Sequence, residues 1–305
     1  MQITDNTGKV LYSIEQSELF PDYRSVLLDA IANGIDLTNL SVENQNLQKI
    51  YFQGVNLCNA SFKNCNMQGV EFISCIANDI DFDQCNLIGL KIKKSNFCNS
   101  GFNLSNISNA SINNSELNES WIKNSNLSNL NAISSNFISC AMYDCNLESS
   151  KFSHAQAENI SFHTCNLKKT VFERCSLMNA NLIHTSSTFE WLQDVTFSFC
   201  NLSDCDLSRL PNLSMLFINE SNIHEAKLDH QTFTKIINEY TTVLYDIDSD
   251  TVWWDSFRGT IEEFRNEIET GFPKTNVDIG YEVYIYSELS KVLVYLEQWK
   301  SNLTN

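Results

Sequence analysis

The sequence lacks the short motifs that accompany common catalytic and cofactor-binding sites. It contains no G-x-x-x-x-G-K-[ST], no G-x-G-x-x-G, no G-x-S-x-G and no C-x-x-C, so nucleotide, dinucleotide, serine-hydrolase and zinc sites are not indicated. It has no run of about 18 apolar residues, so we expect no membrane-spanning helix. Residues 1–8 lack a basic and apolar leader, so we expect a cytoplasmic protein. We expect no enzyme, no cofactor and no metal.

Isolated candidate residues for chemistry do not change this expectation. The five histidines do not recur with a cysteine or carboxylate at a catalytic or metal-binding spacing. Asp246, Asp248 and Asp250 resemble the start of a calcium loop, but that loop requires glycine at its sixth place and a carboxylate at its twelfth. Here these places hold Thr251 and Phe257, so we interpret the segment as a solvated acidic turn.

What the sequence does contain is a five-residue period from residue 37 to residue 207. Of 35 positions spaced by five, 31 are Leu, Phe, Ile, Met or Val. The exceptions are Ala77, Ala132, Ala157 and Ser187. Two residues before each of these positions the residue is mostly small, and one residue before it is often Asn or Asp. Helices repeat near 3.6 and strands at 2, so a period of five predicts a solenoid.

The large and the small residue of each quintet are period-2 neighbours, so both are predicted to point inward. This assigns most cysteines to the core. Nine of the 11 occupy the small inward position, and Cys58 and Cys98 do not. We interpret these nine as small apolar filler. We expect them to be free thiols in a reducing compartment.

The pattern resembles the pentapeptide-repeat family, whose motif is A-(D/N)-L-x-x. The matches include Ala-Asn-Leu at 180–182, Cys-Asn-Leu at 85–87 and 145–147, and Cys-Asp-Leu at 205–207. The resemblance implies a right-handed quadrilateral β-helix with four quintets per coil. Residues 20 apart then stack, which places Phe62 over Phe82 on one face and Phe52 over Phe72 on the opposite one. Counted from residue 37 to residue 228, the quintets make about ten coils.

Each end of this all-β solenoid is predicted to carry a different structure. Residues 1–36 are typical of a cap, with a hairpin around Asn6-Thr7-Gly8 and a helix from Pro21 to Asn33-Gly34. Residues 229–305 are predicted to form a small α-rich (α+β) C-terminal domain. In it we expect a helix over 233–240, a strand over 251–254, a helix from the capping box of Thr260 and Glu263 to Gly271, and a last amphipathic helix over 289–299. The stretch 257–264 resembles a tail of phage-type pentapeptide-repeat proteins.

The register of the repeat changes at two places within residues 37–228. Around residues 184–194 aromatic residues occupy polar positions, which predicts a loop leaving the barrel. At residues 208–212, which include Pro211, one residue is inserted before the period resumes at Leu213. Residues that such a loop and the acidic turn would offer to a protein partner are Phe189, Glu190, Trp191, Asp194, Asp246, Asp248 and Asp250.

The net charge of −17 disfavours direct binding to nucleic acid. The family resemblance implies binding to type II topoisomerases, with the acidic rod taken for duplex DNA. Residues 37–228 carry 17 acids and 12 bases, which is too little to copy the DNA field uniformly. Two forms of mimicry remain open: a local effect, if the carboxylates gather on one side, or mimicry that depends mainly on the diameter of the rod.

Two hypotheses remain open. The chain is either a non-catalytic inhibitor or modulator of a DNA-handling enzyme (gyrase, topoisomerase IV or a nuclease), or a structural adaptor that presents its loop and C-terminal domain to a partner protein. A phage counter-defence role belongs to the same open set, as does a homodimer formed through the C-terminal domain.

Overall fold

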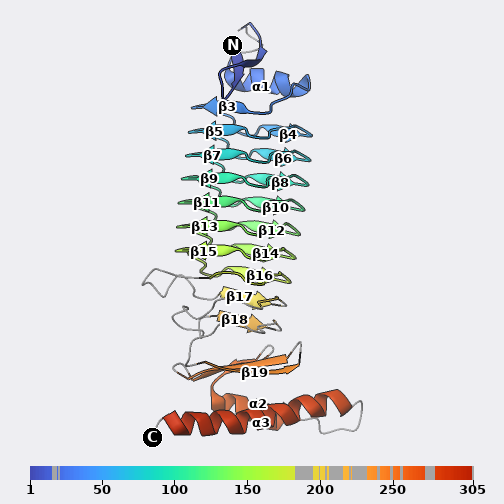
Figure 1. Ribbon diagram of the computed structural model, residues 1–305, viewed down its shortest axis with the longest axis vertical. Coiled ribbons are helices and arrows are strands. Elements are labelled where there is room, and N and C mark those ends of the chain that lie inside the picture. Colours follow the sequence, from blue (N-terminus) through green and yellow to red (C-terminus); the bar gives the residue numbers. More distant parts are fainter. Residues whose placement is uncertain are drawn as a thin grey trace.

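The computed structural model describes residues 1–15, 19, 21–182, 195–198, 200–202, 205, 216–219, 221, 232–238, 241–247, 250–254, 257–271 and 279–303. These residues form a long rod (Figure 1). The N-terminal hairpin and helix lie at one end, stacked strands form the shaft, and a small sheet with two helices lies at the other end.

The N-terminal segment forms the predicted hairpin and helix. Strands β1 (Gln2–Asp5) and β2 (Val10–Ser13) pair antiparallel, and α1 follows at Tyr23–Ala32. Asp22 caps α1 by accepting the backbone N–H of Ser25 at 2.8 Å. β1 also pairs antiparallel with β3 (Leu40–Glu43), the first strand of the shaft. The hairpin thereby covers the open edge of the first coil, which would otherwise be free to pair with another chain.

The shaft is a β-solenoid of stacked parallel strands. One sheet, called sheet A below, continues from β3 through β5 (Ser61–Lys63), β7 (Asp81–Asp83), β9 (Gly101–Asn103), β11 (Trp121–Lys123), β13 (Ala141–Tyr143) and β15 (Ser161–His163). The second, called sheet C, contains β4 (Tyr51–Gln53), β6 (Glu71–Ile73), β8 (Lys91–Lys93), β10 (Ser111–Asn113), β12 (Asn131–Ile133), β14 (Lys151–Ser153), β16 (Val171–Glu173), β17 (Val195–Ser198) and β18 (Leu216–Asn219).

Two ladders of single bridges complete the four sides of each coil. One runs from Asn46 to Asn166 and the other from Asn56 to Asn201. From β3 to β16 all four ladders repeat every 20 residues, as the four-quintet prediction requires. About seven turns lie within residues 37–182, and β17 and β18 extend sheet C by two strands. The rest of the predicted ten coils lies outside the described residues.

The core of the shaft is built from stacked phenylalanines. Phe52 lies on Phe72 with ring centroids 4.9 Å apart, and Phe62 lies on Phe82 at 5.4 Å. The two stacks meet edge to face across the core, with Phe72 and Phe82 at 6.1 Å and 70°. The predicted aromatic ladders on opposite faces are therefore confirmed. Edge-to-face and offset arrangements are those that aromatic rings prefer.

The register on either side of both predicted irregularities can be measured. Phe172 of β16 pairs with Phe197 of β17, so this coil contains five residues more than the regular 20. Phe197 pairs with Ile218 of β18, which confirms a single inserted residue in the next coil. The predicted loop at 184–194 itself lies outside the described residues.

The C-terminal part contains an antiparallel sheet and two helices. The strands are β19 (Thr232–Asn238), β20 (Thr241–Asp246), β21 (Thr251–Trp254) and β22 (Phe257–Gly259). The helices are α2 (Ile261–Gly271) and α3 (Ile279–Leu303). The strand at 251–254 and both later helices are confirmed, and Thr260 and Glu263 form the capping box. The helix predicted over 233–240 is wrong, because Thr232–Asn238 forms the strand β19, which pairs with β20.

This small sheet has a role at the end of the shaft. Leu244 and Trp253 belong to the same buried cluster as the solenoid core. Val243, Tyr245 and Val252 instead pack against α2 and α3. Residues 243, 244 and 245 alternate between the two clusters, as strand residues do. The sheet thus closes the last coil on one face and carries the helices on the other.

Candidate protein-binding faces

The outward residues of the coils determine which surface each side of the rod presents. We group the side chains of residues 41–179 by the ladder to which they belong, together with the turn that follows each strand. Following the chain around a coil, the order is sheet A, the Asn46 ladder, sheet C and the Asn56 ladder. The Asn56 ladder and sheet A are therefore adjacent, and so are the Asn46 ladder and sheet C.

The carboxylates of these coils gather on two adjacent sides. The Asn56 ladder carries four acids and no base, and sheet A carries four acids and two bases. We call these two sides together the acidic side. Its acids are Glu43, Asp79, Asp81, Asp83, Glu116, Glu119, Asp144 and Glu158, and its bases are Lys63 and Lys123. The acidic side therefore has eight acids and two bases, a net charge of −6.

The opposite two sides, together called the basic side, carry the remaining charges. Their bases are Lys49, Lys91, Lys93, Lys94, Lys151, Lys168, Lys169 and Arg174, and their acids are Glu71, Glu148 and Glu173. The net charge there is +5. Two of the acids are paired, since Lys91 contacts Glu71 at 2.7 Å and Lys151 contacts Glu173 at 2.7 Å. The nearly neutral net charge of these coils thus conceals a charge separation across the rod.

The carboxylates of the Asn56 ladder form a local cluster around Cys98. Burial, followed by the charges of Glu116, Glu119 and Asp79, raises the pKa of the Cys98 thiol. Glu116 accepts hydrogen bonds from the Nδ2 atoms of Asn118 at 3.3 Å and Asn136 at 2.8 Å. A carboxylate held by two amides is fixed in position at the surface.

Asp81 is the acid of sheet A with the most constrained environment. Burial, followed by the charge of Asp83, raises the pKa of its carboxyl group. Its Oδ1 atom is buried and has no hydrogen-bond partner. Asp83, by contrast, accepts a hydrogen bond from Asn103 Nδ2 at 2.8 Å. Asp81 is therefore the acid at which ionisation opposes folding.

The residues predicted for partner binding are only partly described. Phe189, Glu190, Trp191, Asp194 and Asp248 lie outside the described residues. Asp246, at the end of β20, is 7% exposed.

Asp250 accepts a hydrogen bond from the Tyr245 hydroxyl at 3.0 Å and contacts Lys300 Nζ at 2.6 Å. It thereby ties the turn between β20 and β21 to α3. The role of all seven predicted residues in binding stays a prediction.

The nine cysteines assigned to the small inward position are all buried, whereas Cys58 and Cys98 are partly exposed. All 11 are free thiols. Burial raises the pKa of the Cys140 thiol to about 12. A hydrogen bond between the side chains of Cys65 and Cys85, which stack one coil apart as predicted, raises the pKa of Cys85 and lowers the pKa of Cys65 to about 7. The burial of all nine thiols agrees with their interpretation as core filler.

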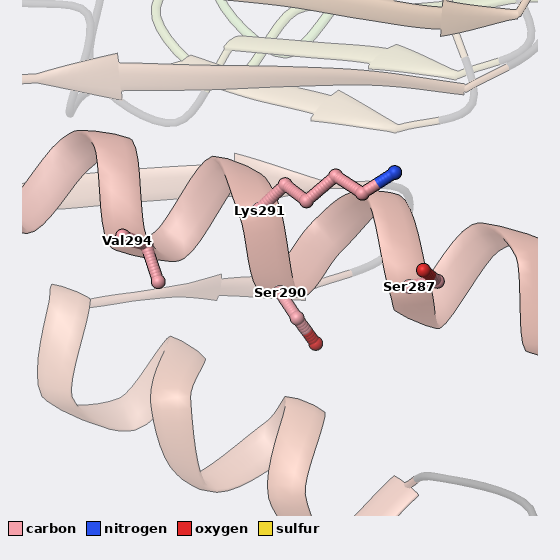
Figure 2. A pocket seen from close by; sticks show the side chains of 4 residues that line it. All are labelled: Ser287, Ser290, Lys291 and Val294. Carbon is pink, nitrogen blue, oxygen red and sulfur yellow. The ribbon is translucent and has the colours of Figure 1, made fainter.

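Other surfaces offer less. A shallow depression on α3 is lined by Ser287, Ser290, Lys291 and Val294 (Figure 2). Lys291 contacts Glu288 at 2.6 Å, and this pair lies along one exposed helix. Among the described residues, no group of three or more His, Cys, Asp or Glu side chains is arranged to hold a metal ion, and no helix is long and apolar enough to cross a membrane.

Comparison with protein families identifies the repeat. The model of the pentapeptide repeats (8 copies) matches residues 35–72 and 65–103, and the five-residue register of the structure continues beyond this match to residue 182. The chain carries a pentapeptide-repeat domain. No curated protein matches the sequence significantly.

Solved structures of pentapeptide-repeat proteins are similar to this chain over part of its length. HetL of the cyanobacterium Nostoc sp. strain PCC 7120, involved in heterocyst differentiation regulation, is 16% identical, with 67% of this chain and 90% of HetL covered and a TM-score of 0.34. Full-length QnrB1, a plasmid-mediated fluoroquinolone resistance protein, is 18% identical, with 62% and 87% covered and a TM-score of 0.28. Rfr23 of the cyanobacterium Cyanothece 51142 is 15% identical, with 47% and 83% covered and a TM-score of 0.16. At these values the likeness concerns the fold class alone.

We did not predict from the sequence that carboxylates gather on one side of the rod, although the sequence contains the signal for it. Residue numbers that differ by 20 fall on one side of the coil, so sorting the charged residues by that period separates Glu116 from Lys91. We predicted partner binding at the loop and the acidic turn, which belong to the irregular parts of the chain. The regular part carries the most ordered charged surface.

Proposed function

We propose that the chain is a non-catalytic, protein-binding rod whose acidic side occupies the DNA-binding surface of a DNA-handling enzyme, such as a gyrase, topoisomerase IV or a nuclease. The observation that supports this proposal is the gathering of eight carboxylates and only two bases on two adjacent sides of residues 41–179. Such a surface complements a basic groove and repels nucleic acid itself.

The acidic side has only part of the charge of duplex DNA, so the proposed mimicry is partial. Seven coils at about 4.8 Å per layer extend over about 34 Å. Duplex DNA of that length carries about 20 charges. The acidic side, with a net charge of −6, therefore has about a third of the charge of duplex DNA, concentrated on one side. This is enough to orient the rod on a basic groove, while shape and local contacts must supply the remaining affinity.

The class of partner comes from the family resemblance, since topoisomerase binding is the activity which that resemblance implies. The N-terminal and C-terminal segments also have a negative net charge. Residues 1–36 carry six acids and two bases, and residues 229–305 carry 14 acids and six bases. Acidity at both ends disfavours direct contact with DNA, so a protein is the proposed partner.

A supercoiling assay tests the proposal. The purified chain is titrated against gyrase with relaxed plasmid, and relaxation by topoisomerase IV is assayed in parallel. We expect supercoiling to fall as the chain approaches stoichiometry with the enzyme, and the effect to weaken as salt is raised. Absence of any effect at stoichiometric excess on both enzymes, together with absence of binding to an immobilised basic nuclease, removes the proposal.

The adaptor hypothesis is supported by a separate observation. The coil between β16 and β17 holds five residues more than the regular 20, and Phe189 and Trp191 fall within it. Aromatic side chains of this kind anchor many protein interfaces. If the adaptor role is correct, Trp191→Ala weakens partner binding while neutralisation of the acidic side leaves it unchanged. Counter-defence activity and a C-terminal homodimer remain proposals that the same binding assays, combined with light scattering, address.

A further inference from the structure

The outward face of sheet A carries a contiguous aromatic surface at its centre. We define the Trp121 patch as Leu104, Trp121, Lys123, Tyr143 and His163, which come from four successive coils. The Lys123 ammonium lies 5.1 Å from the Trp121 ring centroid and 5.5 Å from the Tyr143 ring centroid. Tyr143 stacks on His163 at 4.7 Å, with ring planes inclined by 4°. The backbone N–H of Leu104 donates to the Lys123 carbonyl at 3.0 Å, so Leu104 lies beside this lysine.

The indole of Trp121 is held in place by an exception in the repeat. Gly101 precedes it by one coil, and a Cβ atom at Gly101 would lie 2.3 Å from Trp121 Cζ2. Any other residue there would clash with the ring, so the glycine lets the indole lie flat against the strand. The same virtual Cβ would lie 2.6 Å from Asp81 Oδ1, the carboxylate oxygen that has no hydrogen-bond partner. The indole and an acid therefore lie side by side.

Leu104 is a second exception. It occupies the turn position with φ of 49°, where most coils place Asn, Ser, Asp or Gly, and its side chain is 54% exposed. A leucine there has both an unfavourable backbone conformation and an apolar side chain in water. Residues that break the local rule without a structural gain commonly mark a functional surface.

The charge around the patch indicates what it binds. The patch lies on the acidic side, with Asp81 and Asp83 beyond Gly101 and Asp144 next to Tyr143 in the chain. A half-buried indole and an exposed phenol, rimmed by carboxylates, complement a guanidinium group, which stacks on aromatic rings and forms bidentate hydrogen bonds with carboxylates. In the free chain, Lys123 occupies the aromatic faces that such a group would use.

We infer that the Trp121 patch is the anchor point for an arginine-bearing surface of a protein partner, with Lys123 held on its rings in the free chain and displaced on binding. This inference rests on the proposed function for the class of partner. It adds the residues that provide short-range affinity, because the net charge of the acidic side alone is only about a third of that of duplex DNA.

The test uses peptides, so that it does not depend on which enzyme is the partner. The full chain is titrated with a fluorescein-labelled oligo-arginine peptide and with an oligo-lysine peptide of the same length, and anisotropy is recorded. We expect tighter binding of the arginine peptide. Trp121→Ala and Tyr143→Ala should each weaken its binding about fivefold and reduce the preference for arginine. The fold should tolerate Trp121→Ala, since Ala141 occupies the equivalent position one coil later, and thermal unfolding checks this.

Two matched controls separate the patch from general electrostatics. Tyr51 is 43% exposed on sheet C, on the basic side, so Tyr51→Ala should leave binding unchanged. Lys123→Gln and Lys93→Gln remove the same charge from opposite sides, and only Lys123→Gln should tighten binding of the arginine peptide markedly.

Equal binding of the two peptides, equal loss in Tyr51→Ala and Trp121→Ala, or no binding of the arginine peptide to the unaltered chain would overturn the inference. If the peptide binds as expected but gyrase, topoisomerase IV and nuclease are all unaffected, the patch stands and the proposed function fails.

Discussion

At the scale of the residue, one position of each quintet adopts a positive φ and forms the turn. Across residues 39–179, the second residue after each large inward side chain has a positive φ, and only Gly54, Gly69 and Gly89 among them are glycines. Asparagine is the commonest residue there because its short polar side chain tolerates this conformation. Residues other than glycine therefore form nearly all the turns.

Leu104 and Asn124 provide a test of this rule, since both have φ of 49° and occupy the same column one coil apart. Leu104→Asn should raise the free energy of unfolding by about 0.5–1 kcal/mol, whereas Asn124→Leu should lower it by a similar amount. Guanidinium unfolding midpoints of both variants measure this. Leu104→Asn should also weaken binding of the arginine peptide, so stability and binding change in opposite directions. A lower midpoint for Leu104→Asn would contradict the assignment.

Asp81 predicts a pH dependence. Burial and Asp83 raise the pKa of Asp81 in the folded chain above its ordinary value of 3.8. The folded state then holds this proton more tightly than the unfolded state, so the associated stability is present below that value and is lost as pH rises through the folded pKa. Asp81→Asn should therefore unfold at a higher temperature than the unaltered chain near neutral pH. The difference should disappear near pH of about 3. Glu43→Gln, which removes an exposed carboxylate from the same sheet, serves as the control and should leave the unfolding temperature unchanged.

At the scale of the element, the column of small inward residues that contains Cys85 and Ser105 is a hydrogen-bonded ladder. Ser105 Oγ donates to the Phe82 carbonyl at 3.3 Å and accepts the backbone N–H of Cys85 at 3.1 Å. Cys85 Sγ makes the corresponding contact with the Phe62 carbonyl at 3.3 Å. Along this column the thiol of cysteine and the hydroxyl of serine make the same kind of contact. This explains why cysteine and serine share this position in the sequence.

Replacement of single members of this column should show the shared role. Ser105→Ala removes a donor and an acceptor from buried backbone groups and should lower the free energy of unfolding by about 1–3 kcal/mol. Ser105→Cys keeps both contacts and should cost clearly less. Cys85→Ser should likewise be close to neutral. Equal losses for Ser105→Ala and Ser105→Cys, measured by denaturant unfolding, would show that volume and not hydrogen bonding determines this position.

At the scale of the whole molecule, the coil turns a mixed sequence of charges into two opposed surfaces. Lysines and carboxylates are mixed along the chain. The period of 20 nevertheless places Asp79, Glu116, Glu119 and Glu158 on one ladder, and this ladder has no base among residues 56–179. A rod of this kind presents one sign of charge to a partner and the other sign to the opposite direction. Its orientation on a charged groove is thereby determined.

Neutralisation of one side at a time tests this orientation. The combined variant with Glu116→Gln, Glu119→Gln and Glu158→Gln should weaken inhibition in the supercoiling assay about tenfold or more and reduce its salt dependence. Lys91→Gln, Lys93→Gln and Lys94→Gln alter three charges on the basic side and should leave inhibition unchanged or slightly stronger. If both triple variants behave alike, the net charge and not its placement governs the interaction.

The sequence predicted the regular part of the fold because one local rule is repeated there many times. The inward large residue, the small residue before it and the stacking of Phe62 on Phe82 all follow from the five-residue period and the family resemblance. The capping box at Thr260 was equally readable, since its two hydrogen bonds join residues three apart. Residues 233–240 were misread as a helix, because short apolar segments fit both periods and only pairing with β20 decides between them.

By itself the sequence determined the solenoid, its four ladders, the buried thiols and the position of the one-residue insertion, since all of these depend on neighbours at fixed spacing. Only the tertiary structure decided that Gly101 makes room for the Trp121 indole, and that Leu244 and Trp253 close the last coil. These features depend on contacts between residues that are distant along the chain or belong to different elements, and no local pattern specifies such contacts.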